Sequence, residues 1–217
     1  MGGGGGAGVF NDISRYKHNY ISINDTIIST EARISHLAHL HAFETFTNEK
    51  VSNFSVILEF GGGYGGMTEL LNKINRNLTY IVIDFAPILA VMYFGLVNII
   101  DKQINRVTKA SPVLKNAVNF IDINDIDSIL MPQPDLLIAT WSLSESDIKT
   151  FDRVVNKNFL FGAHYVLYGY RYNELTNPRQ PCSNPIISNH YITQHHELCP
   201  WTANKENMYQ ILKKKHQ

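Results

Sequence analysis

Residues 56–67 read VILEFGGGYGGM and are the most informative segment of the chain. An apolar run ends in an acid, Glu59, and five glycines occur among the next seven residues. Gly61, Gly63 and Gly65 allow the backbone to turn sharply and to approach a ligand more closely than a Cβ would permit. The helix that follows exposes its first amide groups, which favour an electronegative ligand group. The segment therefore predicts a strand, a ligand-binding turn and a helix.

Similar apolar runs recur on the C-terminal side of this segment. Counting the first, they lie at residues 56–58, 81–83, 136–139 and 165–168, with a weaker one at 117–121. Helical patterns lie between them, at residues 67–76, 87–101 and 145–158. Strands that are apolar throughout are covered by helices on both faces, as in a parallel sheet. The alternation predicts an α/β fold with a doubly wound, Rossmann-like, mostly parallel sheet.

The N-terminal part of the chain precedes this alternation. Residues 1–8 are a glycine-rich lead, which we expect to be flexible. The stretch from there to residue 28 has no clear period and predicts a loosely structured arm. A helix capped by Thr30 is predicted to run to about Thr47. We therefore interpret residues 9–54 as an arm and a helix in front of the main domain.

The C-terminal part also departs from the central pattern. Three prolines are expected to break any regular element between residues 173 and 188. Residues 190–198 are interpreted as a strand, and residues 208–215 as a strand or a short helix, between which periodicity does not decide. We favour the strand, so that the two form a terminal antiparallel pair. The sequence contains no linker, so residues 55–217 are expected to form one domain.

The composition excludes several classes of protein. The 217 residues are 44% hydrophobic and 18% charged, which is enough to bury a sizeable core. Nineteen basic residues balance nineteen acidic ones, whereas nucleic-acid-binding proteins generally carry a basic excess. Two cysteines are too few for a disulfide scaffold, and no apolar run approaches the roughly 18 to 20 residues of a membrane span. We expect a cytoplasmic protein without a secretory signal and without a nucleic-acid or membrane partner. The sequence does not indicate its oligomeric state.

The glycine turn fits two kinds of nucleoside cofactor. Gly61, Gly63 and Gly66 satisfy the G-x-G-x-x-G fingerprint of dinucleotide-binding folds, which permits NAD. The same segment also reads acid-x-G-x-G-x-G, with Glu59 as the acid. Asp84 ends the next strand, where a carboxylate accepts hydrogen bonds from both hydroxyls of a ribose in dinucleotide folds. The residues alone leave both cofactors open.

The glycine segment resembles motif I of the class I S-adenosylmethionine-dependent methyltransferases. The resemblance implies that the loop wraps the methionine part of the cofactor and that Glu59 helps to orient its ammonium group. It also implies that Asp84 binds the ribose and that Asp122, after the third strand, lies near the adenine. A carboxylate at Glu59 would repel the pyrophosphate of NAD, and the loop begins some sixty residues into the chain, later than in short-chain dehydrogenases. S-adenosylmethionine is therefore the expected cofactor, and an NAD-dependent oxidoreductase is the alternative.

The expected cofactor contacts lie at or just beyond the carboxyl ends of neighbouring strands, where ligands of open α/β sheets bind. They are Glu59, Gly61, Gly62, Gly63, Tyr64, Gly65, Asp84, Phe85, Asp122, Ile123, Thr140, Trp141 and Ser142. Trp141 has two interpretations that remain equally open. Its ring stacks on adenine or a sugar, or it packs half-buried at the strand end.

The sugar O-methyltransferase family found in bacterial surface-polysaccharide gene clusters has segments similar to residues 58–66, 80–84 and 142–145. Pro87 and the aromatic-bearing predicted helix with Met92, Tyr93 and Phe94 are part of the same similarity. Leu143 stands where that family has an aromatic residue. The similarity covers about residues 55–170 and implies methyl transfer to a sugar hydroxyl. The expected partner is then a small-molecule or glycan acceptor. A methyltransferase-like domain that binds without catalysis is a further alternative.

A sugar hydroxyl is a weak nucleophile, so a base is expected beside it. Glu145 is the first candidate, because the family segment ends on it and it lies just beyond a strand end. His39, His195 and His196 are further candidates, and the adjacent pair is expected to point to opposite faces of a strand. His36 and His39 lie one turn apart on a predicted helix, but no metal site is predicted.

Overall fold

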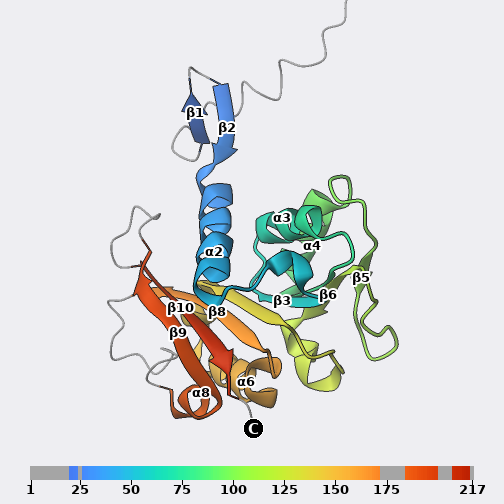
Figure 1. Cartoon of the computed structure of the whole chain (residues 1–217). Coiled ribbons are helices and arrows are strands. Elements are labelled where there is room, and N and C mark those ends of the chain that lie inside the picture. Colours follow the sequence, from blue (N-terminus) through green and yellow to red (C-terminus); the bar gives the residue numbers. More distant parts are fainter. Residues whose placement is uncertain (1–19, 24–25, 172–183, 200–206, 216–217) are drawn as a thin grey trace, which may run out of the picture.

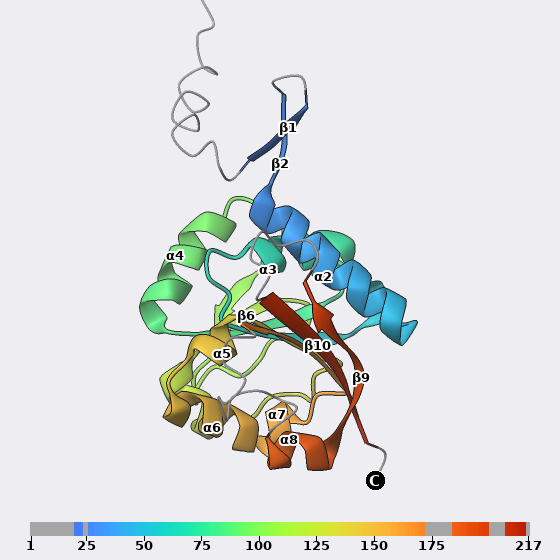
Figure 2. The ribbon, with the colours of Figure 1, turned by 90° about the vertical axis from the view of Figure 1, so that its left-hand side faces the viewer.

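The computed structural model describes residues 20–23, 26–171, 184–199 and 207–215 of the chain. Within these ranges an eight-stranded sheet lies between two layers of helices, as Figures 1 and 2 show in two orientations. The predicted fold class, an α/β fold with a doubly wound Rossmann-like sheet, is confirmed.

Most strands of this sheet run parallel to one another. Their bounds are β3 Val56–Phe60, β4 Thr79–Asp84, β5 Ile104–Arg106, β6 Val118–Asp122, β7 Leu136–Thr140, β8 Tyr165–Arg171, β9 Tyr191–Leu198 and β10 Asn207–Lys214. The order across the sheet is β5-β6-β4-β3-β7-β8-β10-β9, and each neighbouring pair from β5 to β8 is parallel. β10 is antiparallel to both β8 and β9, which confirms the predicted antiparallel terminal pair. The parallel register places the carboxyl ends of β3, β4, β6 and β7 along one edge, where ligands of such sheets bind.

One face of the sheet is covered by three helices, α2 (Glu31–Thr47), α3 (Gly66–Ile74) and α4 (Ala86–Leu96). Leu40 and Phe43 of α2 are at most 4% exposed and belong to the core on this face. Leu71 of α3 and Met92 of α4 are fully buried in the same core. The helix predicted to end near Thr47 is thus confirmed as α2, and its apolar side is what holds it on the sheet.

The other face carries shorter helices, η3 (Ile123–Ser128), α5 (Ser142–Glu145), α6 (Ile148–Asn156), α7 (Asn158–Phe161) and α8 (Pro185–His190). Phe151, Val154 and Val155 of α6 are spaced as i, i+3 and i+4 and are at most 1% exposed. This spacing puts them on one side of the helix, which packs on the sheet.

Two predicted elements differ from the structure. The helix predicted over residues 145–158 is divided, because the Asp147 carboxylate caps a new helix by accepting from the amides of Lys149 and Thr150. The predicted break before residue 188 is wrong for α8, where Asn184 caps the helix and Pro185 takes its first position. A proline there costs no hydrogen bond, because the first amides of a helix lack partners in any case.

The N-terminal arm also differs from its prediction where the structure describes it. β1 (Tyr20–Ile23) and β2 (Thr26–Thr30) form an antiparallel hairpin, which is labelled in Figure 1. The predicted loose arm is therefore wrong over these strands. The glycine-rich lead and the rest of the arm, residues 1–19 and 24–25, lie outside the described residues.

The short element α7 is a left-handed turn. The φ angles of Asn158, Phe159, Leu160 and Phe161 lie between 49° and 59°, and that of Gly162 is 70°. Each non-glycine residue in this conformation costs about 1 to 2 kcal/mol. The Tyr191 hydroxyl donates to the carbonyl oxygens of Phe159 at 2.8 Å and of Ala163 at 3.0 Å. Hydrogen bonds from outside the turn therefore help to hold it.

Candidate functional site

The glycine loop connects β3 to α3 at the ligand-binding edge of the sheet. Gly61 and Gly63 have φ angles of 81° and 55°, which an L-residue with a Cβ rarely adopts. A Cβ on Gly61 would overlap the Ser142 side chain, whereas a Cβ on Gly63 would meet no atom within 4 Å. The backbone at Gly63 thus borders open space on the exposed side of the loop. Gly62 and Gly65 instead lie close to side chains of α4, so packing accounts for the absence of a Cβ at these two positions.

Asp84 supports the loop from the end of β4. Its carboxylate accepts from the amide of Gly63 at 3.3 Å and from the amide of Phe85 at 2.7 Å. Partial burial raises the pKa of this carboxyl, and the backbone donors oppose that rise. The predicted ribose-binding acid is therefore also a structural support of the glycine loop.

A cavity of about 320 Å³ opens beside the loop, within the size range of small-molecule sites. Six of the residues expected to contact ligand or acceptor line it: Gly61, Asp84, Phe85, Ile123, Ser142 and Glu145. The sequence analysis missed Ser146, Asp147 and Thr150, which also line it. The acid at the start of α6 was visible in the sequence, but only the fold places it here.

The charged side chains that line the cavity are all acidic. Among the described residues that line it, Asp84, Glu145 and Asp147 carry carboxylates and none carries a positive charge. Hydrogen bonds from the Thr150 side chain and amide lower the pKa of Asp147, which keeps it ionised. At the rim, the Glu145 carboxylate lies 3.4 Å from the Arg171 guanidinium, and both side chains are 53% exposed. The arrangement favours a ligand with positive charge.

Glu59 lies beneath the loop and is 5% exposed. Its Oε2 atom accepts from the hydroxyl of Tyr80 at 2.8 Å and from that of Thr68 at 3.2 Å. Burial raises the pKa of Glu59 to about 7, and the two hydroxyl donors oppose that rise. Glu59 therefore connects β3 with β4 and α3, and its role toward a cofactor ammonium stays a prediction.

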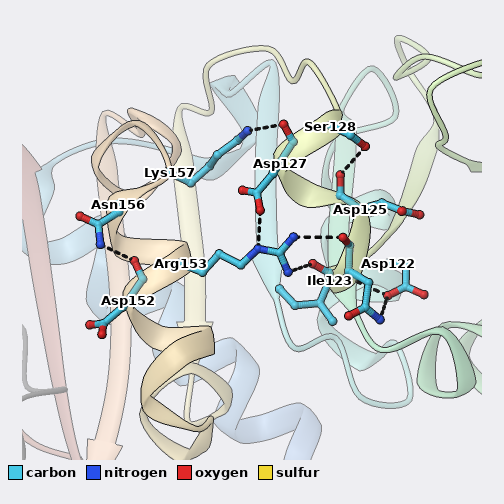
Figure 3. Close-up of polar contacts among 10 residues, drawn as sticks. Asp122, Ile123, Asp125, Asp127, Ser128, Asp152, Arg153, Asn156 and Lys157 are labelled. Carbon is cyan, nitrogen blue, oxygen red and sulfur yellow. Dashed lines mark hydrogen bonds and ion pairs between the residues drawn. The ribbon is translucent and has the colours of Figure 1, made fainter.

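The segment after β6 is held by a side chain that the sequence analysis did not identify, as Figure 3 shows. Arg153 of α6 donates to the carbonyl oxygens of Ile123 at 2.8 Å and of Asn124 at 3.0 Å. It also forms an ion pair of 2.6 Å with Asp127. Asp122 caps η3 by accepting from the amide of Asn124 at 2.9 Å. Arg153 thus fixes the position of Ile123 at the cavity wall.

A hydrogen bond connects the segment after β7 with the end of β3, next to the glycine loop. The Ser142 hydroxyl donates to the carbonyl oxygen of Phe60 in β3. Trp141, just after Thr140, has a φ angle of 71°, a conformation that is strained for tryptophan. Its ring centroid lies 6.1 Å from that of His39 on α2, and Trp141 is not among the residues that line the cavity. Its stacking on adenine stays a prediction.

The three histidines considered as bases, His39, His195 and His196, lie away from the cavity. His39 is 1% exposed, and burial lowers its pKa to about 4, so its imidazole is neutral at pH 7. His195 stacks on Phe46 of α2 with ring centroids 3.3 Å apart. The neighbouring His196 is hydrogen-bonded to the Tyr170 hydroxyl. The adjacent pair lies on opposite faces of β9, as predicted, and none of the three histidines lines the cavity.

The structure adds two general findings on the described parts of the chain. No group of three or more His, Cys, Asp or Glu side chains there has the geometry of a metal site. None of the helices described is both long enough and apolar enough to span a membrane.

Comparison with known proteins identifies the fold. No family model and no curated protein matches the sequence. Among solved structures, the N-methyltransferase NodS from Bradyrhizobium japonicum WM9 is similar with a TM-score of 0.56 and 13% identity, over 86% of this chain and 97% of that one. Magnesium protoporphyrin IX methyltransferase ChlM from Synechocystis PCC 6803, solved with bound SAM, gives 0.58 and 9%, over 96% and 92%.

A third similar structure, the mitomycin 7-O-methyltransferase MmcR, gives a TM-score of 0.55 and 9% identity over 85% of this chain. This chain spans about half of its length, 54%. At such identities the likeness concerns the fold. The chain therefore has the Rossmann-like fold of S-adenosylmethionine-dependent methyltransferases.

Proposed function

We propose that the chain is a methyltransferase that binds S-adenosylmethionine in the cavity beside the glycine loop. The observation that carries this proposal is the lining of that cavity, in which Asp84, Glu145 and Asp147 are acidic and no described residue is basic. S-adenosylmethionine brings a sulfonium and an ammonium group, which suit such a lining. The bound cofactors of ChlM and of NodS, which was also solved with S-adenosyl-L-homocysteine, support the same choice.

The same lining argues against the NAD alternative. A dinucleotide places a pyrophosphate beside the glycine loop, where donors and positive charge stabilise it. Here the Asp84 carboxylate already accepts a hydrogen bond from the amide of Gly63. A diphosphate would meet negative charge at this point, at a cost that a cationic sulfonium avoids.

The residues of the chain would act mainly by positioning. When bound, S-adenosylmethionine supplies an electrophilic methyl group on its sulfonium sulfur. The Ser142 hydroxyl and the Arg153 guanidinium hold two walls of the cavity, so the ligand meets a preformed site. Alignment of an acceptor with a reactive group is worth several kcal/mol of the barrier. Glu145 at the rim would take the proton of the acceptor.

We further propose that the acceptor is a sugar hydroxyl of a surface-polysaccharide precursor. Two features support it: the resemblance of short motifs, residues 58–66, 80–84 and 142–145, to segments of the sugar O-methyltransferase family, and the pairing of Glu145 with Arg171 at the cavity rim. A carboxylate and a guanidinium together suit a polar, hydroxyl-rich molecule. NodS is an N-methyltransferase and MmcR an O-methyltransferase, so the fold is compatible with either acceptor atom.

Calorimetric titration with S-adenosylmethionine and with NAD tests the cofactor. We expect saturable binding of the first and none of the second. Asp147→Asn should weaken S-adenosylmethionine binding about three- to tenfold while keeping the helix cap, because asparagine caps helices as well as aspartate does. Asp152→Asn, an exposed change on the same helix outside the cavity, is the matched control and should bind normally.

Methyl transfer from labelled cofactor to a panel of nucleotide sugars tests the reaction. Incorporation that depends on the sugar and on the protein would support the acceptor class. Tight NAD binding without S-adenosylmethionine binding would overturn the cofactor proposal. Cofactor binding without transfer to any sugar, amine or carboxylate acceptor would favour a non-catalytic binding domain.

A further inference from the structure

Helix α4 is apolar on the side that faces the sheet and also on the side that faces away from it. Leu89, Met92 and Leu96 form the inner side and are at most 7% exposed. Val91 and Phe94 lie on the opposite side and are 62% and 76% exposed. A helix that is apolar all round is ordinarily buried, whereas a surface helix carries polar residues on its outer side.

The segment that contains α4 also lacks the charged residues of an ordinary surface helix. The sequence from Phe85 to Ile100 contains no charged residue. α4 lies at the outside of its helical layer, as Figure 2 shows, and α2 covers a different part of the sheet. Among the described residues, no other element covers the outer side of α4, which is an apolar surface at the edge of the sheet's helical layer.

The size of this surface fits a protein interface. Besides Val91 and Phe94, four further side chains of the segment are 39–53% exposed: Ile88, Tyr93, Val97 and Ile99. Since a full aromatic side chain covers about 150–250 Å², the six together expose on the order of 600 Å². The largest apolar patch of a typical monomer is about 300–600 Å². A stable interface buries about 800 Å² on each partner.

A groove runs beside the projecting ring of Phe94. This cavity of about 250 Å³ lies between Ala90 and Tyr93 of α4 and two strands of the sheet. The edge strand β5 contributes Arg106, and its neighbour β6 contributes Phe120 and Asp122. An apolar cavity of about 150 Å³ already holds a benzene ring. The surface therefore has both a projecting phenyl ring and a groove large enough for one.

We propose that α4 and this groove form the interface of a homodimer, in which Phe94 of each copy enters the groove of the other. Closed two-fold dimers are the commonest oligomers, and they require one patch that is complementary to itself. A ring and a matching groove on one patch meet this requirement. The segment from Phe85 to Ile100 is itself uncharged, and the groove carries one charge of each sign, Arg106 and Asp122, so the interface does not collect charges of one sign. This inference does not depend on the proposed function.

Sedimentation equilibrium of the full chain over about a hundredfold range of concentration tests the dimer. The wild-type chain should be dimeric, and Phe94→Glu should raise the dissociation constant at least about 30-fold, the equivalent of a 2 kcal/mol hot spot. Ala90→Leu, which narrows the groove from an exposed position, should weaken the dimer as well. Leu130→Glu is the matched control, because Leu130 is 95% exposed outside this surface, and it should dimerise normally.

Circular dichroism of Phe94→Glu should match the wild type, since the side chain is mostly exposed. A wild-type chain that is monomeric at every concentration would overturn the inference. So would a dimer that Phe94→Glu leaves intact. A monomer that sediments with neutral phosphatidylcholine vesicles would assign the surface to lipid and would equally overturn it.

Discussion

Alanine at Gly61 and alanine at Gly63 should damage the glycine loop in different ways. Both glycines have positive φ angles, 81° and 55°. An alanine in the left-handed region costs about 1 to 2 kcal/mol, so this part of the loss is common to the two variants. What differs is the space around the new methyl group.

At Gly61 the methyl group would overlap the side chain of Ser142, whereas at Gly63 it would enter open space. Forcing an extra carbon into a packed position costs about 1 to 3 kcal/mol more. Gly61→Ala should therefore lower the free energy of unfolding by about 2 to 5 kcal/mol. Gly63→Ala should lower it by only about 1 to 2 kcal/mol. Its methyl group would meet no protein atom within 4 Å, so its effect on S-adenosylhomocysteine affinity tests whether the loop wraps the cofactor as proposed.

Urea unfolding followed by circular dichroism gives the stabilities, and a second substitution tests the cause. Ser142→Gly alone removes the hydrogen bond to the Phe60 carbonyl and should cost about 1 kcal/mol. Combined with Gly61→Ala it also removes the overlap, so the coupling energy should exceed about 1 kcal/mol. Equal losses for the two glycine variants would refute the reasoning. Strictly additive losses in Gly61→Ala/Ser142→Gly would refute it as well.

Three further predictions concern single side chains. Arg153→Met should weaken S-adenosylhomocysteine binding about tenfold in calorimetry, since two charge-assisted hydrogen bonds that hold the cavity wall are lost. The control is Lys149→Met, an exposed change on the same helix, which should bind normally. Burial raises the pKa of Glu59 from 4.5 to about 7, so its contribution to stability is lost as the pH rises. Between pH 5 and pH 8 the wild type should lose about 2 kcal/mol more unfolding free energy than Glu59→Gln, and parallel pH profiles would count against this. Glu145→Gln should keep cofactor affinity and slow single-turnover methyl transfer about 10²- to 10⁴-fold; a rate within about threefold of wild type would remove it as the base.

The central fold could be predicted because its signals are local. Apolar runs such as residues 136–139 mark buried strands, and five glycines between a strand and a helix mark the ligand loop. The predicted strands at the C-terminal side became β9 and β10, and the apolar residues of β10, such as Tyr209 and Ile211, are buried. In these places the local pattern and the tertiary packing favour the same structure.

The rest depends on contacts between distant residues. Arg153 holds Ile123 across thirty positions, and nothing in its neighbourhood in the sequence distinguishes it from a surface arginine. Asp147 enters the cavity only because α5 ends two residues earlier. Phe159, in the left-handed turn, carries no local signal for that conformation, and its carbonyl is held by Tyr191, far along the chain.

The strand order has a consequence for how the sheet can assemble. β9 precedes β10 in the chain, yet among the described strands it pairs only with β10, which lies between β9 and β8. β9 can therefore join the sheet only when β10 pairs with β8. Hairpin formation takes about 1 to 10 μs, so the two strands can pair first and arrive as one unit. Refolding of this edge is then set by the search of a preformed hairpin for β8, and a weakened β8–β10 contact releases two strands at once.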